Sequence, residues 1–209
     1  MLAYESQIAG ISDDARTVRG ALIRLIQQKS RKQIARRRAE AVVAVRRIAH
    51  LEFVNGGGTG SIESTSRESA VTEIAAGSGI MAPGIFDHYR AFTPTPAAYF
   101  GLDVVRRPAH NIAAVLGGGW IASGPIGDDR RPVISYPEGL EYVAAEQAGE
   151  VQTPVRGNAA RDLRIGDRVW FRHAKAGEVC EHLDSVQLIR GNDHTGAWKT
   201  YRGEGQLFL

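Results

Sequence analysis

Glycines, hydroxyl residues and an asparagine gather in residues 51–61, whose sequence is LEFVNGGGTGS. A short apolar run that ends in a glycine-rich turn is typical of a strand that delivers a loop at its C-terminal end. Because glycines lack Cβ, their backbone N–H groups can approach an anion closely, and Thr59 and Ser61 add hydroxyl donors. The segment predicts a phosphate-binding loop. The alternative is a flexible surface turn, since neither the lysine of a P-loop nor the dinucleotide-binding spacing is present.

A second segment repeats this pattern in residues 72–80, with the sequence TEIAAGSGI. It predicts another short strand, followed by Gly-Ser-Gly. Two consecutive strand ends that carry small residues and a hydroxyl suit the phosphate site of a parallel barrel. We therefore expect Gly57, Thr59 and Ser78 to line one pocket.

A third cluster lies in residues 171–182, FRHAKAGEVCEH, which hold two histidines, one cysteine and two glutamates. Such a mixture of nitrogen, sulfur and oxygen ligands could bind Zn²⁺. The spacing matches no zinc finger, and Lys175 puts a positive charge inside the cluster. The alternative is ordinary polar residues at a strand exit, with Cys180 as a small core residue.

The elements that would carry these residues follow from periodicity. Helical spacing of apolar residues predicts a helix over about 16–50, the outer layer of a barrel. Its basic run, residues 31–38, could contact RNA or lipid, but a solvated helix face is the favoured interpretation.

Strands are predicted over 51–55 and 71–76, and a helix over 81–92. After a Pro-rich link at 93–96, an all-β module is predicted, with a turn or bulge at Gly117–Gly119 before Trp120. Its strands are 99–106, 111–116, 133–135, 151–153, 168–171 and 186–189.

Composition limits the class of protein. The chain has 209 residues and a net charge of +3, too small an excess to predict a nucleic-acid partner. No apolar run reaches the length of a membrane span, and the N-terminus lacks the pattern of a secretory signal. Cys180 is the one cysteine, which suits a reducing compartment. We expect a cytoplasmic protein with neither membrane nor nucleic-acid contact.

Several motifs occur in a fixed order: Tyr4-Glu5, QIAG at 7–10, FVNGGGTG at 53–60, AGSG at 76–79, GGGW at 117–120 and HAKAGE at 173–178. In this order they resemble the D-threonine aldolase and D-serine dehydratase-like group, in particular its amino-acid deaminase/aldolase branch. Those are pyridoxal-phosphate enzymes of the alanine-racemase fold. The resemblance implies an α/β plus all-β architecture: the C-terminal half of a (β/α)8 barrel over residues 1–93, then a C-terminal β domain over 97–209.

The resemblance also implies site residues. In the family, pyridoxal 5'-phosphate is held by loops that match the two glycine-rich segments, and a tyrosine that Tyr4 matches lies near its ring. His173 matches the first member of a His-x-Cys or His-x-Asp metal pair, but Lys175 stands at the second position. A divalent metal would then need Cys180, Glu178 or His182, and we expect no metal of native affinity. The implied cofactor-binding residues are Tyr4, Asn55, Gly57, Gly58, Thr59, Ser61, Gly77, Ser78 and Gly79.

The family attaches its cofactor to a lysine on the first barrel strand. None of the four lysines, Lys29, Lys32, Lys175 and Lys199, is predicted at such a strand. The resemblance therefore implies the C-terminal part of a lyase or deaminase acting on D-amino or β-hydroxy amino acids, inactive without a segment that supplies the lysine. The expected partners are an amino acid substrate and either an N-terminal-half chain or a second copy. The alternative is a non-catalytic module that binds a phosphate ligand or a partner.

Overall fold

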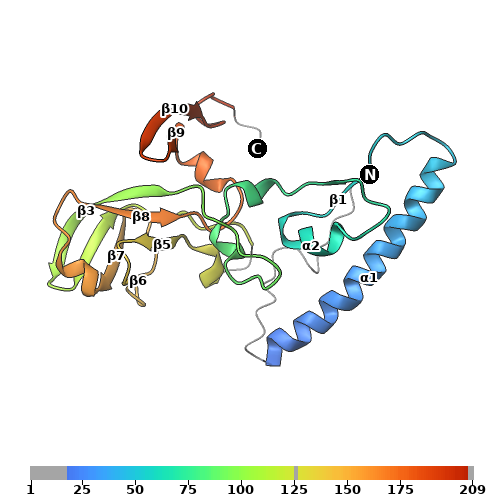
Figure 1. The fold of residues 1–209 in the computed structure, drawn as a ribbon. Helices are drawn as coiled ribbons and strands as arrows, with labels where there is room; N and C mark the ends of the chain where they lie inside the picture. The colour runs from blue at the N-terminus through green and yellow to red at the C-terminus, as the bar shows by residue number, and fades with distance from the viewer. Residues whose placement is uncertain (1–17, 125–126, 207–209) are drawn as a thin grey trace. The chain divides into compact units, whose positions relative to one another are not determined.

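The computed structural model describes residues 18–124 and 127–206 (Figure 1). The chain divides into two compact units, of which the first ends at Ala97 and the second begins at Ala98. Each unit has its own cluster of buried apolar side chains. Within the described ranges, no helix combines the length and the apolar character that crossing a membrane requires.

Helix α1, Val18–Arg46, dominates the first unit and confirms the long helix predicted there. It contains no proline, and alanine and arginine, both strong helix formers, recur along it. Its buried positions include the polar residues Gln27 and Ser30 as well as Val42. Apolar side chains such as Leu22 and Leu25 are exposed. The described residues therefore cover only part of the apolar surface of this helix.

The remaining elements of the first unit are short. Strand β1, Asn55–Gly56, pairs in parallel with β2, Glu73–Ile74, so both predicted strands exist but are shorter than expected. Helix α2, Ile62–Thr65, follows the first glycine-rich loop. The described residues of this unit also form three 3-10 turns: η1 Thr59–Ser61, η2 Gly77–Ile80 and η3 Gly84–Phe86.

The helix predicted over 81–92 is wrong. Only the turn η3 forms there, because Ala82 has a φ of +50° and Pro83 is extended with a ψ of 158°, and neither angle continues a helix. The apolar residues that suggested the helix instead form an aromatic cluster. The Phe86 and Tyr89 rings pack edge to face at 5.3 Å, and Phe92 lies against both.

The second unit contains a six-stranded antiparallel sheet in the order β5-β8-β3-β4-β7-β6 (Figure 1). Strands β5 and β6, at the two ends of this order, contact each other, so the sheet nearly closes into a barrel. The Tyr142 hydroxyl, on β6, donates to the Pro132 carbonyl just before β5 at 2.9 Å and joins the two ends. The bounds are β3 Phe100–Ala109, β4 Ile112–Leu116, β5 Val133–Tyr136, β6 Leu140–Tyr142, β7 Gln152–Gly157 and β8 Arg168–Arg172.

Alternation along the strands builds the core of this sheet. On β3 every second residue, Phe100, Leu102 and Val104, is buried. Strand β8 adds Val169 and Phe171, and the Phe100 and Phe171 rings stack at 5.5 Å. Period-two burial places these side chains on one face. All six predicted strands of the module are confirmed, with small changes at their ends.

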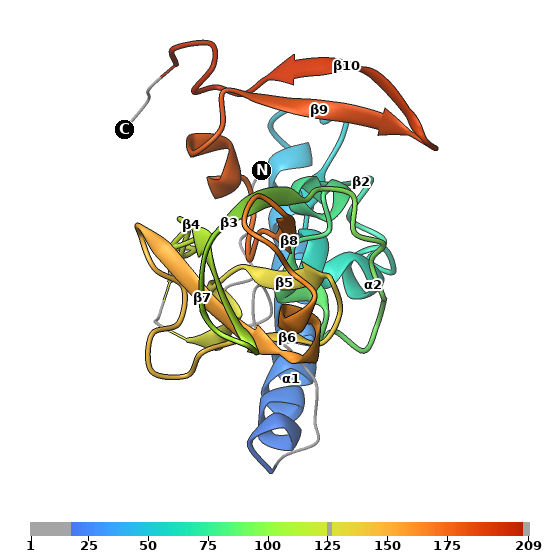
Figure 2. The same cartoon turned by 90° about the vertical axis from the view of Figure 1, so that its left-hand side faces the viewer.

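A separate hairpin of β9, Ser185–Arg190, and β10, Asp193–Lys199, belongs to the same unit (Figure 2). Among the described residues of this unit, η4 Asp128–Arg130 precedes β5 and η5 Asn158–Arg161 lies between β7 and β8. A further 3-10 turn, η6 Glu178–Glu181, lies between β8 and the hairpin. Neither β6 nor β10 was predicted from the sequence.

Candidate functional site

The two glycine-rich loops of the first unit lie side by side. Because β1 and β2 are parallel, the loops that follow them leave the same edge of the strand pair. The Oγ1 of Thr59 lies 3.0 Å from the Oγ of Ser78, and the Gly79 N–H donates to Thr59 Oγ1 at 2.9 Å. The expected proximity of Thr59 and Ser78 is confirmed. A pocket lined by both residues together with Gly57 stays a prediction.

Several donors at this junction have no acceptor among the described residues. They include the N–H groups of Thr59 and Gly60, which begin η1, and those of Gly77 and Ser78, which begin η2. Thr59 is only 5% exposed, and its oxygen already accepts the Gly79 N–H. When the Thr59 hydroxyl donates to Ser78, the proton of Ser78 is left for a ligand. The junction is thus a set of hydrogen-bond donors that suits an anion.

Glycine is required here mainly by the chain's own side chains. A Cβ at Gly57, where φ is +73°, would lie 2.7 Å from Thr65 Oγ1, and one at Gly60 would lie 2.9 Å from the hydroxyl of Tyr89. At Gly77, by contrast, a Cβ would meet nothing within 4 Å. The resemblance assigned Gly57, Gly58, Gly77 and Gly79 to the cofactor. The structure shows that Gly57, like Gly60, permits the loop to pack.

Other predicted cofactor residues shape the loops. Ser61 is buried, and its hydroxyl oxygen accepts the Gly58 N–H at 3.1 Å and the hydroxyl of Thr65 at 3.2 Å. The Asn55 amide donates to Glu73 Oε1 at 2.5 Å across the strand pair. Tyr4 lies outside the described residues. A direct role of these residues toward a ligand stays a prediction.

A buried ion pair lies next to the end of β1, and no sequence pattern predicted it. The guanidinium of Arg38, on α1, donates to Glu68 Oε2 at 2.6 Å, and the two side chains are 1% and 11% exposed. A Cβ at Gly56 would lie 3.1 Å from Arg38 Cζ, so the ion pair supports the end of β1. The basic run at 31–38 was interpreted as a solvated helix face. That interpretation is correct for Arg36 and Arg37, which are exposed, but wrong for Arg38, which is buried.

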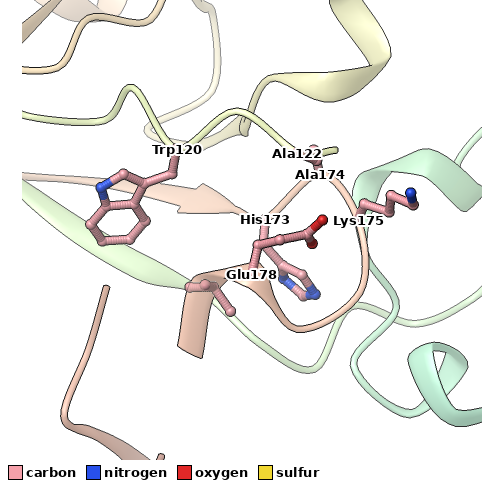
Figure 3. A pocket seen from close by; sticks show the side chains of 7 residues that line it. Trp120, Ala122, His173, Ala174, Lys175 and Glu178 are labelled. Atoms are coloured by element: carbon pink, nitrogen blue, oxygen red, sulfur yellow. The ribbon is translucent and has the colours of Figure 1, made fainter. Parts of the chain in front are cut away.

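The second unit has a small pocket at the end of β8, with room for about one water molecule. Its wall includes Trp120, His173, Lys175 and Glu178 (Figure 3). In Figure 3 the Glu178 carboxylate points away from Trp120, toward the side where the imidazole and Lys175 lie. Trp120 packs on Phe100 with ring centres 4.3 Å apart.

Ser123 connects the two charged residues of this pocket. Lys175 Nζ donates to the Ser123 carbonyl at 3.2 Å and to its hydroxyl at 3.0 Å. Glu178 Oε1 accepts the Ser123 N–H at 3.3 Å and its hydroxyl at 3.1 Å. Burial of Glu178 opposes ionisation, but these hydrogen bonds, a further one from its own N–H and the Lys175 charge lower the pKa of the carboxyl. Glu178 is therefore a carboxylate.

His173 is the most buried polar residue of the pocket, at 5% exposure. Its Nε2 is buried without a hydrogen-bond partner among the described residues, and so is Glu178 Oε2. Burial and the Arg172 charge lower the pKa of His173, while Glu178 partly opposes this. The imidazole is neutral at physiological pH.

The metal that the resemblance implies does not fit these residues. Within the described part of the chain, no group of three or more histidine, cysteine or acidic side chains is placed to hold an ion. Neither Cys180 nor His182 lines the pocket. Burial raises the pKa of the Cys180 thiol, which disfavours the thiolate that a metal requires. The imidazole of His182 instead stacks on Trp120, with centres 4.6 Å apart.

The buried imidazole predicts a pH dependence of stability. Because the pKa of His173 is lower in the folded chain, the unfolded chain binds more protons once the pH falls below about 6.5, and stability decreases with falling pH. In His173→Gln this contribution is absent, so the unfolding temperature should fall less between pH 7.5 and 5.5. Calorimetry at several pH values checks this. His110→Gln, which removes an exposed imidazole, is the control, and parallel profiles for wild type and His173→Gln would contradict the assignment.

The chain is similar to known proteins in fold rather than in sequence. No protein-family model matches the sequence, and no curated protein matches it significantly. By fold, D-threonine aldolase from Filomicrobium marinum matches over 85% of this chain and 49% of its own, with a TM-score of 0.70 and 20% identity. A variant of D-threo-3-hydroxyaspartate dehydratase matches over 82% and 50%, with a TM-score of 0.63 and 18% identity.

An alanine racemase-like protein from Idiomarina loihiensis matches over 82% of this chain and 51% of its own, with a TM-score of 0.56 and 13% identity. The chain thus spans about half the length of each of these structures. It has the fold of about half of an alanine-racemase-like protein, part of an α/β barrel followed by a β domain, as the resemblance in sequence motifs implied.

Proposed function

We propose that the first unit binds the phosphate of pyridoxal 5'-phosphate between its two glycine-rich loops. We further propose that the chain is part of a lyase or deaminase acting on D-amino or β-hydroxy amino acids. The observation that carries the proposal is the contact of Thr59, Ser78 and Gly79 across the ends of two parallel strands. The likeness in fold to D-threonine aldolase and D-threo-3-hydroxyaspartate dehydratase supports the choice of ligand.

The loops supply donors without a positive charge of their own. The Ser78 hydroxyl and the N–H groups at the starts of η1 and η2 would hold the phosphate oxygens. Thr59 orients Ser78 and is itself held by the Gly79 N–H. When bound, pyridoxal phosphate supplies an electron sink for reactions at the α-carbon of amino acids. The loops contribute the binding and the orientation.

Catalysis further requires a lysine, which we propose another segment supplies. Lys29 and Lys32 are exposed on α1, Lys175 bonds to Ser123 in the second unit, and Lys199 is exposed at the end of β10. None of them is on β1 or β2. The uncovered apolar side chains of α1 are consistent with a missing part of the barrel.

The same lysine positions favour a second candidate, a module that binds a phosphate ligand without catalysis. The two candidates differ in turnover. The lyase proposal expects activity on D-threonine only when a segment with the attachment lysine is added, whereas the module proposal expects none. Activity of the isolated chain, lost on borohydride reduction at one of its four lysines, would contradict both.

Binding itself is tested with ligands that lack the aldehyde, because aldehydes react with surface lysines. Equilibrium dialysis of the 209-residue chain against pyridoxamine 5'-phosphate and pyridoxamine separates the phosphate from the ring. We expect weak binding of the phosphate compound and at least about tenfold weaker binding of pyridoxamine, because the donors all lie in the phosphate loops. Equal affinities would refute the phosphate site.

The Thr59 hydroxyl should contribute measurably to this affinity. Thr59→Val keeps the shape of the side chain but removes the acceptor of the Gly79 N–H and the partner of Ser78. We expect the affinity for pyridoxamine 5'-phosphate to fall about fivefold, equivalent to about 1 kcal/mol. The matched control is Ser66→Ala, which removes an exposed hydroxyl of the same unit. An unchanged affinity in Thr59→Val would place the phosphate elsewhere.

A further inference from the structure

The pocket of the second unit already contains a positive charge. Lys175 Nζ donates to the carbonyl and to the hydroxyl of Ser123, at 3.2 Å and 3.0 Å. The same hydroxyl lies 3.1 Å from Glu178 Oε1. Ser123 thus bridges an ammonium and a carboxylate, and one positive charge balances one negative charge.

Two further polar atoms of this pocket are buried without a partner among the described residues. They are Nε2 of His173, on a side chain that is 5% exposed, and Oε2 of Glu178. Both residues line the pocket with Lys175 (Figure 3). An imidazole nitrogen and a carboxylate oxygen are the atoms that would face a cation.

We infer that the Lys175 ammonium is the resident cation of this pocket and takes the place of a divalent metal ion. A divalent ion on His173 and Glu178 would have two protein ligands, whereas protein zinc sites use three or four. It would also bring two positive charges next to the ammonium, with one carboxylate to balance all three. The pocket should therefore be neutral and metal-free in its working state. This inference concerns the second unit alone and does not depend on the proposed phosphate site.

The test is the affinity of the full 209-residue chain for Zn²⁺ alone, measured by competition with a chromophoric chelator. Wild type should bind Zn²⁺ no better than its exposed side chains allow. Lys175→Cys removes the ammonium and places a thiol two residues after His173, so its affinity should rise about 100-fold. Adding His173→Ala to that variant should abolish the gain.

The matched control is Lys199→Cys, which exchanges an exposed lysine for the same thiol on β10 and should bind Zn²⁺ no more tightly than wild type. Lys175→Cys binding no more tightly than Lys199→Cys would overturn the inference. So would one tightly bound Zn²⁺ per wild-type chain that His173→Ala removes. This wild-type measurement decides the question even if Lys175→Cys does not fold. A second measurement on wild type does the same: its unfolding temperature should be equal with and without EDTA.

Discussion

Arg38→Ala is expected to lower the free energy of unfolding of the first unit by about 3–5 kcal/mol. The substitution leaves Glu68, whose side chain is 11% exposed, without the guanidinium that it contacts at 2.6 Å. An unpaired buried carboxylate is costly because it loses hydration without gaining a partner. The Arg38→Ala substitution also removes the side chain against which Gly56 packs. The end of β1 and the first glycine-rich loop should therefore become less ordered.

The two units can be followed separately in one urea titration. All three tryptophans, Trp120, Trp170 and Trp198, belong to the second unit, so their fluorescence reports on that unit. The longest helix that the structure describes, α1, lies in the first unit and dominates the circular dichroism at 222 nm. We expect Arg38→Ala to shift the dichroism transition and leave the fluorescence transition in place. Arg37→Ala, which truncates an exposed neighbour, is the control.

The double variant Arg38→Met/Glu68→Leu separates charge from packing. Because removal of both members of a buried ion pair leaves no unpaired charge, this variant should recover most of the lost stability. Equal destabilisation by the single and the double variant would show that the pair acts only through its packing. A wild-type dichroism transition in Arg38→Ala would contradict the ion-pair assignment itself.

Gly57→Val is expected to weaken binding of pyridoxamine 5'-phosphate by about 30-fold, because a backbone strain of about 2 kcal/mol has to be relieved by moving the loop. Gly57 has a φ of +73°, which a β-branched residue avoids, and an added Cβ would lie 2.7 Å from Thr65 Oγ1. The movement displaces Thr59, two residues later, from Ser78.

The control for this prediction is Gly177→Ala, in the second unit. A Cβ at Gly177 meets nothing within 4 Å, and its φ of −104° suits alanine, so this variant should leave the two glycine-rich loops unchanged. Dialysis with both variants gives the two affinities, and dichroism shows whether each is folded. If Gly57→Val binds the phosphate compound as tightly as Gly177→Ala does, the shape of the first loop is irrelevant to the site.

The β module was predictable because its signals are local. On β3 the apolar residues Phe100, Leu102 and Val104 alternate along the sequence, and these are the residues that the structure buries. The missed strand β10 had a signal too. Gly191 and Asn192 form a two-residue connection between β9 and β10, and Gly-Asn between two strand-like runs indicates a hairpin. Strand β10 was missed because residues 193–199 are mostly polar and lack the apolar alternation typical of a strand. The helix wrongly predicted over 81–92 shows that apolar spacing does not overcome a break at Pro83.

The site was predictable only where topology follows from sequence order. Parallel strand ends bring Thr59 and Ser78 together, and the pattern of two strands with glycine-rich ends was sufficient. Arg38 pairs with a residue 30 positions away, and Lys175 with Ser123, 52 positions away. No local pattern encodes such contacts, since they depend on how separate elements pack. Only the structure therefore shows that Trp120 lines the pocket of the second unit and that Ser123 joins Lys175 to Glu178.

The most direct test of the central claim is a heteronuclear NMR titration of the ¹⁵N-labelled chain with pyridoxamine 5'-phosphate and with pyridoxamine. If the two loops hold the phosphate, the largest amide shifts should fall on Gly58, Thr59, Gly77, Ser78 and Gly79, and only with the phosphate compound. Shifts of equal size with pyridoxamine, or shifts confined to residues outside the segments 56–61 and 76–80, would contradict the account.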